Sequence, residues 1–192
     1  MSKTFTCLRC DKCCYFSSEV EAPIIFPYER EIIRNKAEEL KIKDSITFKP
    51  YEVYRVNSDD EELYVVVAYK WLIKGYCPFY DRNSKLCRIH SIKPLSCKMY
   101  PLILNVTCNT IHVSEACNWV RENLDYVLSA NPMNVFQEEI KALLEAYVLF
   151  LNYINTLKDR FSVVEKVHPQ SIRLGRLMDI DKVIESRKRT NT

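Results

Sequence analysis

The feature that most constrains this chain is a crowd of cysteines at its start. The sequence opens MSKTFTCLRCDKCCYF, which places four thiols within eight residues. Five more cysteines follow before residue 120, so nine of the 192 residues are cysteine. A segment so dense in thiols lacks the apolar period of an ordinary core helix or strand. We therefore expect an irregular segment whose shape depends on what its sulfur atoms bind.

Disulfide bonds are the weaker explanation of these cysteines. Bridged Cα atoms usually lie about 4.4–6.8 Å apart with a restricted dihedral angle, which suits the tight opening cluster poorly. The start of the chain shows no apolar signal segment, and the longest apolar-rich run, 142–157, contains Glu145, Asn152 and Asn155. That run is too short and too polar for a membrane span. We expect a cytoplasmic protein with no membrane partner and with reduced thiols.

Metal ligation explains the cysteines better. A C-x-x-C unit lets two sulfurs reach one ion from a tight turn, and amide groups of such turns offset thiolate charge. Zinc takes four ligands in a closed tetrahedral site, and iron–sulfur clusters also use sets of four thiolates. The spacing does not separate these metals. Cys13 and Cys14 point opposite ways if the segment is extended, so one site and two sites both stay open.

Eight of the nine cysteines are the expected ligands. They are Cys7, Cys10, Cys13, Cys14, Cys77, Cys87, Cys97 and Cys117. We leave out Cys108, because it falls at the expected tip of a hairpin, where a free or packed thiol is the simpler assignment. We also leave out His90, although it follows Cys87 by three residues. No pair of nucleophile and base stands out, so we assign no catalytic residue.

Composition excludes two common kinds of function. Glycine occurs only at Gly75 and Gly175, so neither a P-loop nor a glycine-rich dinucleotide turn exists here. The 28 basic and 25 acidic residues leave a net charge of +3, which does not favour a nucleic-acid partner. A basic group lies at the end, in residues 185–192, and we expect a solvated tail there.

Four separate blocks of sequence resemble one known family in their order along the chain. The first is Phe5-x-Cys7-x-x-Cys10-x-x-Cys13-Cys14, and the others are Gly75-x-Cys77-x-Phe79, Cys87-x-Ile89-His90 and Lys93-Pro94-x-x-Cys97-Lys98-x-Tyr100-Pro101. Together they resemble the CxxCxxCC family, also called YkgJ-like and described as a zinc- or iron-chelating domain. The resemblance covers roughly residues 5–120, and it places the last family cysteine on Cys117.

The resemblance implies metal binding more strongly than any reaction. Lys93 and Lys98 stand where the family usually has arginine, so the paired hydrogen bonds of a guanidinium are lost there. His90 stands where tyrosine is common. A larger relative, flagellin lysine N-methylase, carries the same kind of cysteine cluster and implies a protein-modifying enzyme as the alternative. No motif for a methyl donor is present in this sequence.

Periodicity and turn signals predict the remaining elements. They are a helix over 27–42, two strands within 45–72 with a solvated turn at 57–62, a hairpin over 102–113 turning at Asn109-Thr110, helices over 118–130 and 135–161, and a short helical piece over 171–178 before a charged tail.

We therefore expect an α+β protein: a small irregular cysteine-rich metal-binding core with short β-hairpins and a C-terminal helical pair. The expected domains are a cysteine-cluster domain over 1–120 and a helical extension with a charged tail over 121–192. The expected function is to hold an iron–sulfur cluster, of the 4Fe-4S type, or zinc, with the cluster slightly favoured. A protein partner is compatible with this function, including one that contacts the basic tail, but no sequence feature identifies it.

Overall fold

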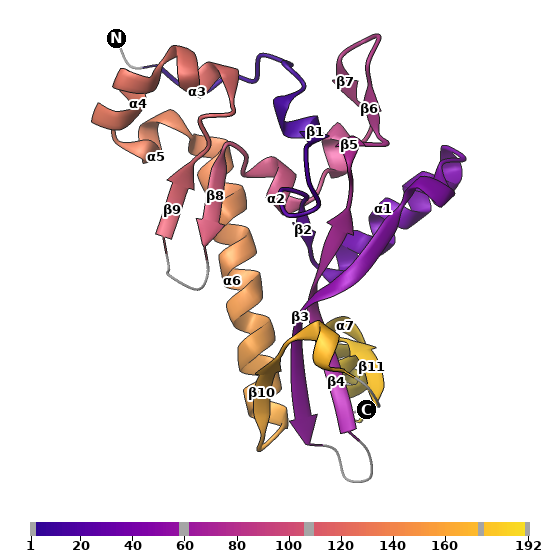
Figure 1. Ribbon diagram of the computed structural model, residues 1–192. Coiled ribbons are helices and arrows are strands. Elements are labelled where there is room, and N and C mark those ends of the chain that lie inside the picture. Colours follow the sequence, from indigo (N-terminus) through magenta and orange to yellow (C-terminus); the bar gives the residue numbers. More distant parts are fainter. Residues whose placement is uncertain (1–2, 58–61, 106–109, 173–174, 191–192) are drawn as a thin grey trace. The chain divides into compact units, whose positions relative to one another are not determined.

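The computed structural model describes residues 3–57, 62–105, 110–172 and 175–190 (Figure 1). Helices and strands are both plentiful, so the predicted α+β class is confirmed. Contacts divide the chain into two compact units. We call residues 1–22 and 73–147 the cysteine unit, and residues 23–72 and 148–192 the sheet unit. The domain boundary at residue 120 stays a prediction, and the contacts divide the chain elsewhere.

A long antiparallel hairpin forms the centre of the sheet unit. It consists of β3 (Thr47–Asn57) and β4 (Glu62–Leu72), as the β-branched and aromatic residues on both sides of the polar turn predict. The strand β10 (Val164–Val167) pairs antiparallel with β3, and β11 (Arg176–Asp179) pairs parallel with β4, which gives the order β10-β3-β4-β11. The short β2 (Ile24–Ile25) also pairs with β4. The predicted turn over 57–62 lies mostly outside the described residues.

The predicted first helix of the sheet unit is confirmed as α1 (Pro27–Glu39). Proline suits the first helical position because its missing N–H would have no partner there. The Glu29 carboxylate accepts a hydrogen bond of 2.9 Å from the Phe26 N–H, which satisfies one of the unpaired donors at the helix start. Ile33 and Ala37 are buried one turn apart, so they give this helix its apolar face.

The core of the sheet unit is continuous and apolar. Residues from β3, β4, α6 (Gln137–Arg160) and α7 (Ile180–Thr190) share it, and the buried members are Val56, Val65, Val67, Tyr153, Leu157, Ile180 and Val183. A polar network accompanies this core. Arg30 on α1 contacts the Asp179 carboxylate at 2.6 Å and lies 4.1 Å above the Tyr69 ring, whose hydroxyl also donates to Asp179. The network therefore joins α1, β4 and β11.

One prediction at the C-terminal end is wrong. In the described part of 171–178 there is no α-helix: a 3-10 turn ends at Ser171, and Arg176 begins β11, whose pairing with β4 overrides its weak local preference. The chain then forms the helix α7 (Ile180–Thr190), in which Ile180 and Val183 are buried against the core. Glu185 and Ser186, the first residues of the predicted solvated tail, are exposed.

The cysteine unit contains only short elements. Its paired strands have two to four residues: β1 (Tyr15–Phe16) with β5 (Gly75–Tyr76), β6 (Tyr80–Asp81) with β7 (Leu86–Cys87), and β8 (Leu102–Asn105) with β9 (Thr110–Val113). Its helices, apart from the start of α6, are α2 (Leu95–Lys98), α3 (Asn118–Glu122), α4 (Leu124–Ser129) and α5 (Pro132–Val135), with 3-10 turns at Lys12–Cys14 and His90–Ile92.

The predicted hairpin over 102–113 is confirmed, with a correction at its turn. Thr110 pairs with Asn105 and so belongs to β9 rather than to the turn. Cys108 lies outside the described residues. The helix predicted over 118–130 is divided at Asn123 into α3 and α4. The next predicted helix is α6 (Gln137–Arg160), which begins in the cysteine unit and continues in the sheet unit.

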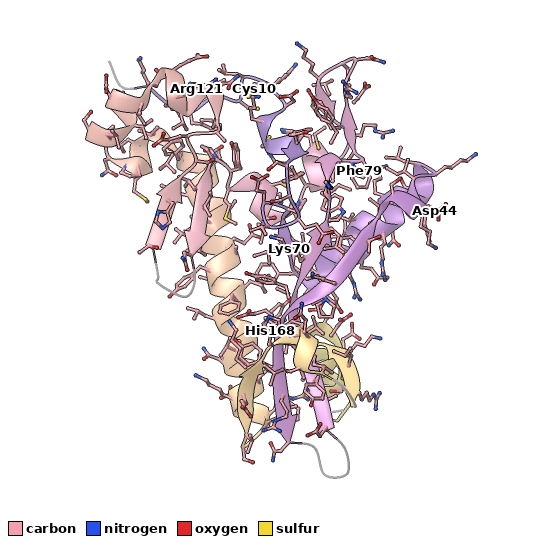
Figure 2. The ribbon with its side chains drawn as sticks, viewed as in Figure 1. Cys10, Asp44, Lys70, Phe79, Arg121 and His168 are labelled. Atoms are coloured by element: carbon pink, nitrogen blue, oxygen red, sulfur yellow. The ribbon has the colours of Figure 1, made fainter. Side chains whose placement is uncertain are left out.

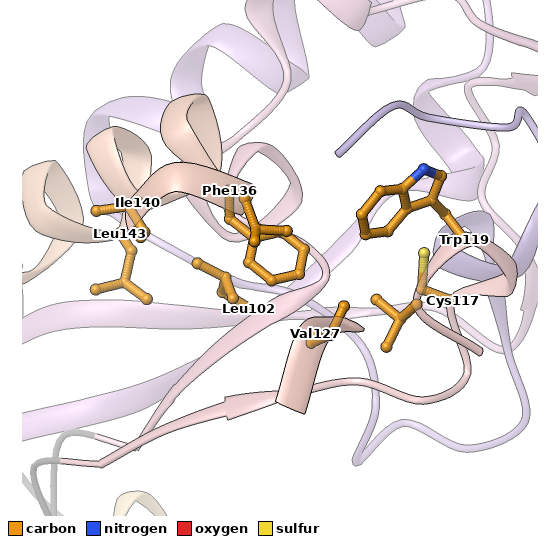
Figure 3. Packing of buried hydrophobic residues seen from close by; sticks show 9 residues of the cluster. Leu102, Cys117, Trp119, Val127, Phe136, Ile140 and Leu143 are labelled. Carbon is orange, nitrogen blue, oxygen red and sulfur yellow. The ribbon is translucent and has the colours of Figure 1, made fainter. Parts of the chain in front are cut away.

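One end of the cysteine unit has a compact aromatic core (Figure 3). Its buried members are Leu102, Cys117, Trp119, Val120, Val127, Val135, Phe136, Ile140 and Leu143. Phe5 joins this core from the N-terminal segment, with its ring centroid 5.3 Å from that of Trp119, and its N–H donates to the Val135 carbonyl at 2.8 Å. The chain just before the first cysteine is therefore held by packing and by a backbone hydrogen bond. Within the described residues, no helix combines the length and apolar character that crossing a bilayer requires.

Candidate metal centre

The N-terminal cysteine segment is tied to the middle of the chain by its backbone. The Cys77 N–H donates to the Cys14 carbonyl at 2.7 Å. Tyr15, which follows Cys14, pairs with Tyr76, which precedes Cys77, between β1 and β5. The chain turns sharply before this point because Asp11 adopts a positive φ of 64°. Aspartate tolerates that left-handed conformation better than most residues. The first and second cysteine blocks are thereby brought together.

The thiols of Cys13 and Cys14 are hydrogen-bonded to each other. Their Sγ atoms are 3.8 Å apart. A hydrogen bond from Cys14 lowers the pKa of the Cys13 thiol, and the nearby positive charge of Lys93 lowers it further. The pKa of Cys14 is raised, because it keeps the proton that it shares with Cys13 and because it is partly buried. Cys13 is therefore the more acidic thiol of the pair.

The later cysteines lie within electrostatic reach of this pair. Burial raises the pKa of Cys77 to about 12, and charge on Cys87 and Cys13 adds to the shift. Burial also raises the pKa of Cys97 well above its ordinary value, and charge on Cys77, Cys13 and Cys87 raises it further. Such effects on the pKa require short separations, because charge interactions fall off with distance and solvent screening. Cysteines from all four sequence blocks thus lie within electrostatic reach of one another.

Cys117 approaches the group from the aromatic core. It is buried beside Trp119 (Figure 3), and its pKa is raised first by burial and then by charge on Cys10 and Cys13. Cys10, labelled in Figure 2, is therefore close to it. Cys7 is exposed, three residues before Cys10. All eight described cysteines are free thiols.

The surroundings suit a group of thiolates. Lys93 favours the charged forms of Cys13, Cys87 and Cys97, which lowers the cost of gathering negative sulfurs. The hydroxyl oxygens of Ser96 and Tyr100 are buried, and that of Ser96 has no partner in hydrogen-bond geometry among the described residues. Burial raises the pKa of Tyr100 to about 12; a hydrogen bond with Ser114 opposes the shift, and charge on Cys117, Cys13 and Cys10 adds to it.

The thiols lie near one another, but the sulfur atoms that the structure describes do not converge on one position where a metal ion could bind. In the described part of the chain, no three cysteine, histidine or carboxylate side chains already stand in an arrangement that could hold a metal ion. The type of donor nevertheless fits, because soft thiolates select zinc and iron–sulfur clusters. The residues therefore suit such a group chemically, and side-chain rotation would have to complete its coordination.

Two tyrosines beside the cysteines, Tyr76 and Tyr80, were not predicted from the sequence to belong to the site. The Tyr76 hydroxyl donates to Asp11 at 3.1 Å, and the Tyr76 and Tyr80 rings stack at a centroid distance of 5.7 Å. The signal in the sequence was the position of the tyrosines: Tyr15 directly follows Cys14, and Tyr76 and Tyr80 lie on the two sides of Cys77. His90, which we left out of the ligands, is exposed, and Lys93 is the main cause of its lowered pKa.

Comparison with known proteins agrees with this chemistry. A family model matches residues 6–123, and its description reads "CxxCxxCC: Putative zinc- or iron-chelating domain". The match includes all eight of the cysteines named above. No curated protein and no solved structure matches the chain. Because the model covers more than half of the 192 residues, the chain belongs to the CxxCxxCC family.

Proposed function

We propose that this protein binds iron or zinc through thiolates of its cysteine unit. The ligands are drawn from Cys7, Cys10, Cys13, Cys14, Cys77, Cys87, Cys97 and Cys117. One observation carries the proposal: the Cys77 N–H donates to the Cys14 carbonyl at 2.7 Å, which holds the second cysteine block against the first. Segments more than 60 residues apart in the sequence therefore bring the same soft donor close together. Thiolates must be reduced to bind, so the proposal also places the protein in the cytoplasm.

Between the two metals, we propose an iron–sulfur cluster of the 4Fe-4S type. The C-x2-C-x2-C spacing and the supply of eight cysteines resemble cluster-binding loops. Such a cluster would supply one-electron transfer, whereas zinc would supply a structural crosslink. In either case the chain contributes the same things: Lys93 offsets thiolate charge, and the Ser96 and Tyr100 hydroxyls are available as donors to sulfur.

Metal binding in this proposal is coupled to folding. The thiols are neighbours but do not yet form a ligating set, so binding must draw their side chains inward. The short strands around them have little apolar burial to resist such movement. The free energy of coordination would then contribute directly to the stability of the cysteine unit.

The decisive experiment is purification without oxygen, followed by a visible spectrum and analysis of iron, zinc and sulfide. Broad absorption near ~400 nm with stoichiometric iron and sulfide supports the cluster. A colourless protein with stoichiometric zinc supports metal binding and rejects the cluster. Folded, freshly isolated protein that contains neither metal overturns the proposal.

A further inference from the structure

A polar hollow lies on the surface of the cysteine unit, where β6 turns into β7. It is wide open to solvent and offers roughly 730 Å³ of accessible space. Its lining residues are Tyr80, Asp81, Arg82, Asn83 and Arg88. Two arginines and one aspartate therefore line a space large enough for a small molecule.

The first arginine is held in place by aromatic rings. The guanidinium carbon of Arg82 lies 4.7 Å from the centroid of Tyr76, and Tyr76 stacks on Tyr80 with an angle of 11° between the rings. Attraction between the cation and the ring face positions the guanidinium without using its N–H donors. In the described part of the chain, Arg82 donates no hydrogen bond and forms no ion pair.

The second arginine is held by the backbone. One Arg88 terminal nitrogen donates to the Pro78 carbonyl at 2.6 Å, and the Arg88 amide donates to the Phe79 carbonyl at 2.9 Å. A guanidinium has five N–H donors, so several remain for another partner. Arg88, too, forms no ion pair with a carboxylate among the described residues.

The carboxylate in the hollow is already engaged by the turn. Asp81 accepts hydrogen bonds from the Asn83 amide at 2.9 Å and from the Ser84 amide at 3.4 Å. These backbone donors are the main cause of its lowered pKa, and the charge of Arg88 is the smallest of the favourable causes. Asp81 therefore organises the turn more than it neutralises the arginines.

We propose that this hollow binds a small ligand that carries an oxyanion, a carboxylate or a phosphate, between Arg82 and Arg88. Arginine suits this role because its planar fork matches both groups with paired hydrogen bonds. The Asn83 side-chain amide and the Tyr80 hydroxyl supply further neutral donors on the lining. No cysteine lines the hollow, so the inference does not depend on the proposed metal centre, although Tyr80 pairs with Cys87 across the β6–β7 ladder.

The inference is tested by titrating the full-length protein, as isolated, with inorganic phosphate and with citrate. Heat of binding and amide shifts are followed at constant low ionic strength, with sodium chloride as the reference salt. We expect saturable 1:1 binding of at least one of the two anions, with the amide shifts centred on residues 80–88. Tighter citrate binding identifies a carboxylate ligand, and tighter phosphate binding identifies a phosphate ligand.

Matched variants separate a built site from general charge. Arg82→Gln and Arg88→Gln should each weaken binding by about tenfold or more, because each removes a charged fork. Arg121→Gln removes the same charge from α3 of the same unit, and it should change the affinity less than about twofold. Asn83→Ala keeps both arginines and should cause a smaller loss, and circular dichroism should show all four variants folded.

Two results would overturn the inference. One is the absence of saturation up to about 50 mM of either anion, a concentration far above the range of useful small-ligand sites. The other is equal weakening by Arg121→Gln and Arg88→Gln, which would mean that only net charge matters. Either result would leave the metal proposal standing, because that proposal rests on the cysteines alone.

Discussion

The two units of this protein are built by different means. In the sheet unit every residue of β4 from Tyr64 to Trp71 is buried, and α6 and α7 contribute to one continuous apolar core. In the cysteine unit the strands β1, β5 and β7, which contain or adjoin cysteines, are two residues long. Residues 23–72 and 148–192 contain no cysteine, so all the thiols belong to the other unit.

This difference shows where stability must come from in each unit. Burial of apolar surface stabilises by about 25 cal/mol per Å², which suits a core made from long strands and helices. The cysteine-bearing turns bury only scattered apolar residues, such as Phe79, Ile89 and Leu95, so apolar burial stabilises them less. A small region of this kind usually needs a disulfide or a metal in addition, and its cysteines are free thiols.

The strongest test of the comparison is Cys97→Ser. If metal stabilises the cysteine unit, this variant should lose most of its bound metal, and the amides of that unit should lose hydrogen-exchange protection. The sheet unit should keep its protection, because its own core is unchanged. Metal content per chain and hydrogen exchange measure the two effects. Full metal content with unchanged exchange would contradict the division proposed here.

The converse test removes apolar packing from the sheet unit. Leu157 is fully buried in that core, so Leu157→Ala should cost about 2–5 kcal/mol of unfolding free energy. The metal content of the folded protein should not change. Urea denaturation followed by circular dichroism measures the loss. Leu151→Ala, at an exposed position on the same helix, is the matched control and should cost less than about 0.5 kcal/mol.

A third variant tests the polar network of the sheet unit. Asp179→Asn takes away the carboxylate that faces Arg30, whose charge is then left partly buried. Because removal of one partner from such a pair is costly, we expect a loss on the order of 3 kcal/mol. A double-mutant cycle with Arg30→Met checks the assignment. Simple addition of the two single losses would mean that the pair is not coupled.

The pH dependence of the sheet unit provides a smaller effect. Burial raises the pKa of Asp181 in the folded protein, although Tyr153 donates to its carboxylate at 2.9 Å. The folded state therefore binds this proton more tightly than the unfolded state, in which the pKa is about 3.9. The contribution of Asp181 to stability is present below that value and is lost as the pH rises through the higher folded pKa.

Asp181→Asn removes this titration. Relative to the natural protein, the variant should therefore be more stable at about pH 7 than at about pH 3.5. Urea midpoints of both proteins at the two pH values give the comparison. The same difference between variant and natural protein at both pH values would show that the folded pKa of Asp181 is not raised.

The smallest expected effect is that of Cys108→Ser. We exclude this thiol from the ligands, so the variant should keep its metal content and its stability. The same metal analysis as for Cys97→Ser applies, which makes the two serine variants a matched pair. An equal loss of metal from both would show that the set of eight ligands is wrong.

Prediction from sequence succeeded where the signal was local. The proline and spaced apolar residues of 27–42 indicated α1, and the β-branched and aromatic residues that flank a polar turn within 45–72 indicated the central hairpin. It failed at 171–178, where a four-residue strand forms because β4 offers a free edge. Burial along α6 depends on tertiary packing: Ile140 and Leu143 are buried, whereas Leu144 and Leu151 are exposed.

By itself, the sequence determined the α+β class, the main helices and strands, the family, and the residue type that would bind metal. These depend on spacing along the chain, which local hydrogen bonding and thiol chemistry translate directly. Only the tertiary structure decided that the Cys77 backbone binds that of Cys14, that the charge of Lys93 acts on Cys13 and Cys97, and that Arg82 and Arg88 line one hollow. Those relations depend on strand pairing and on contacts between distant residues, and a linear pattern does not encode their distances.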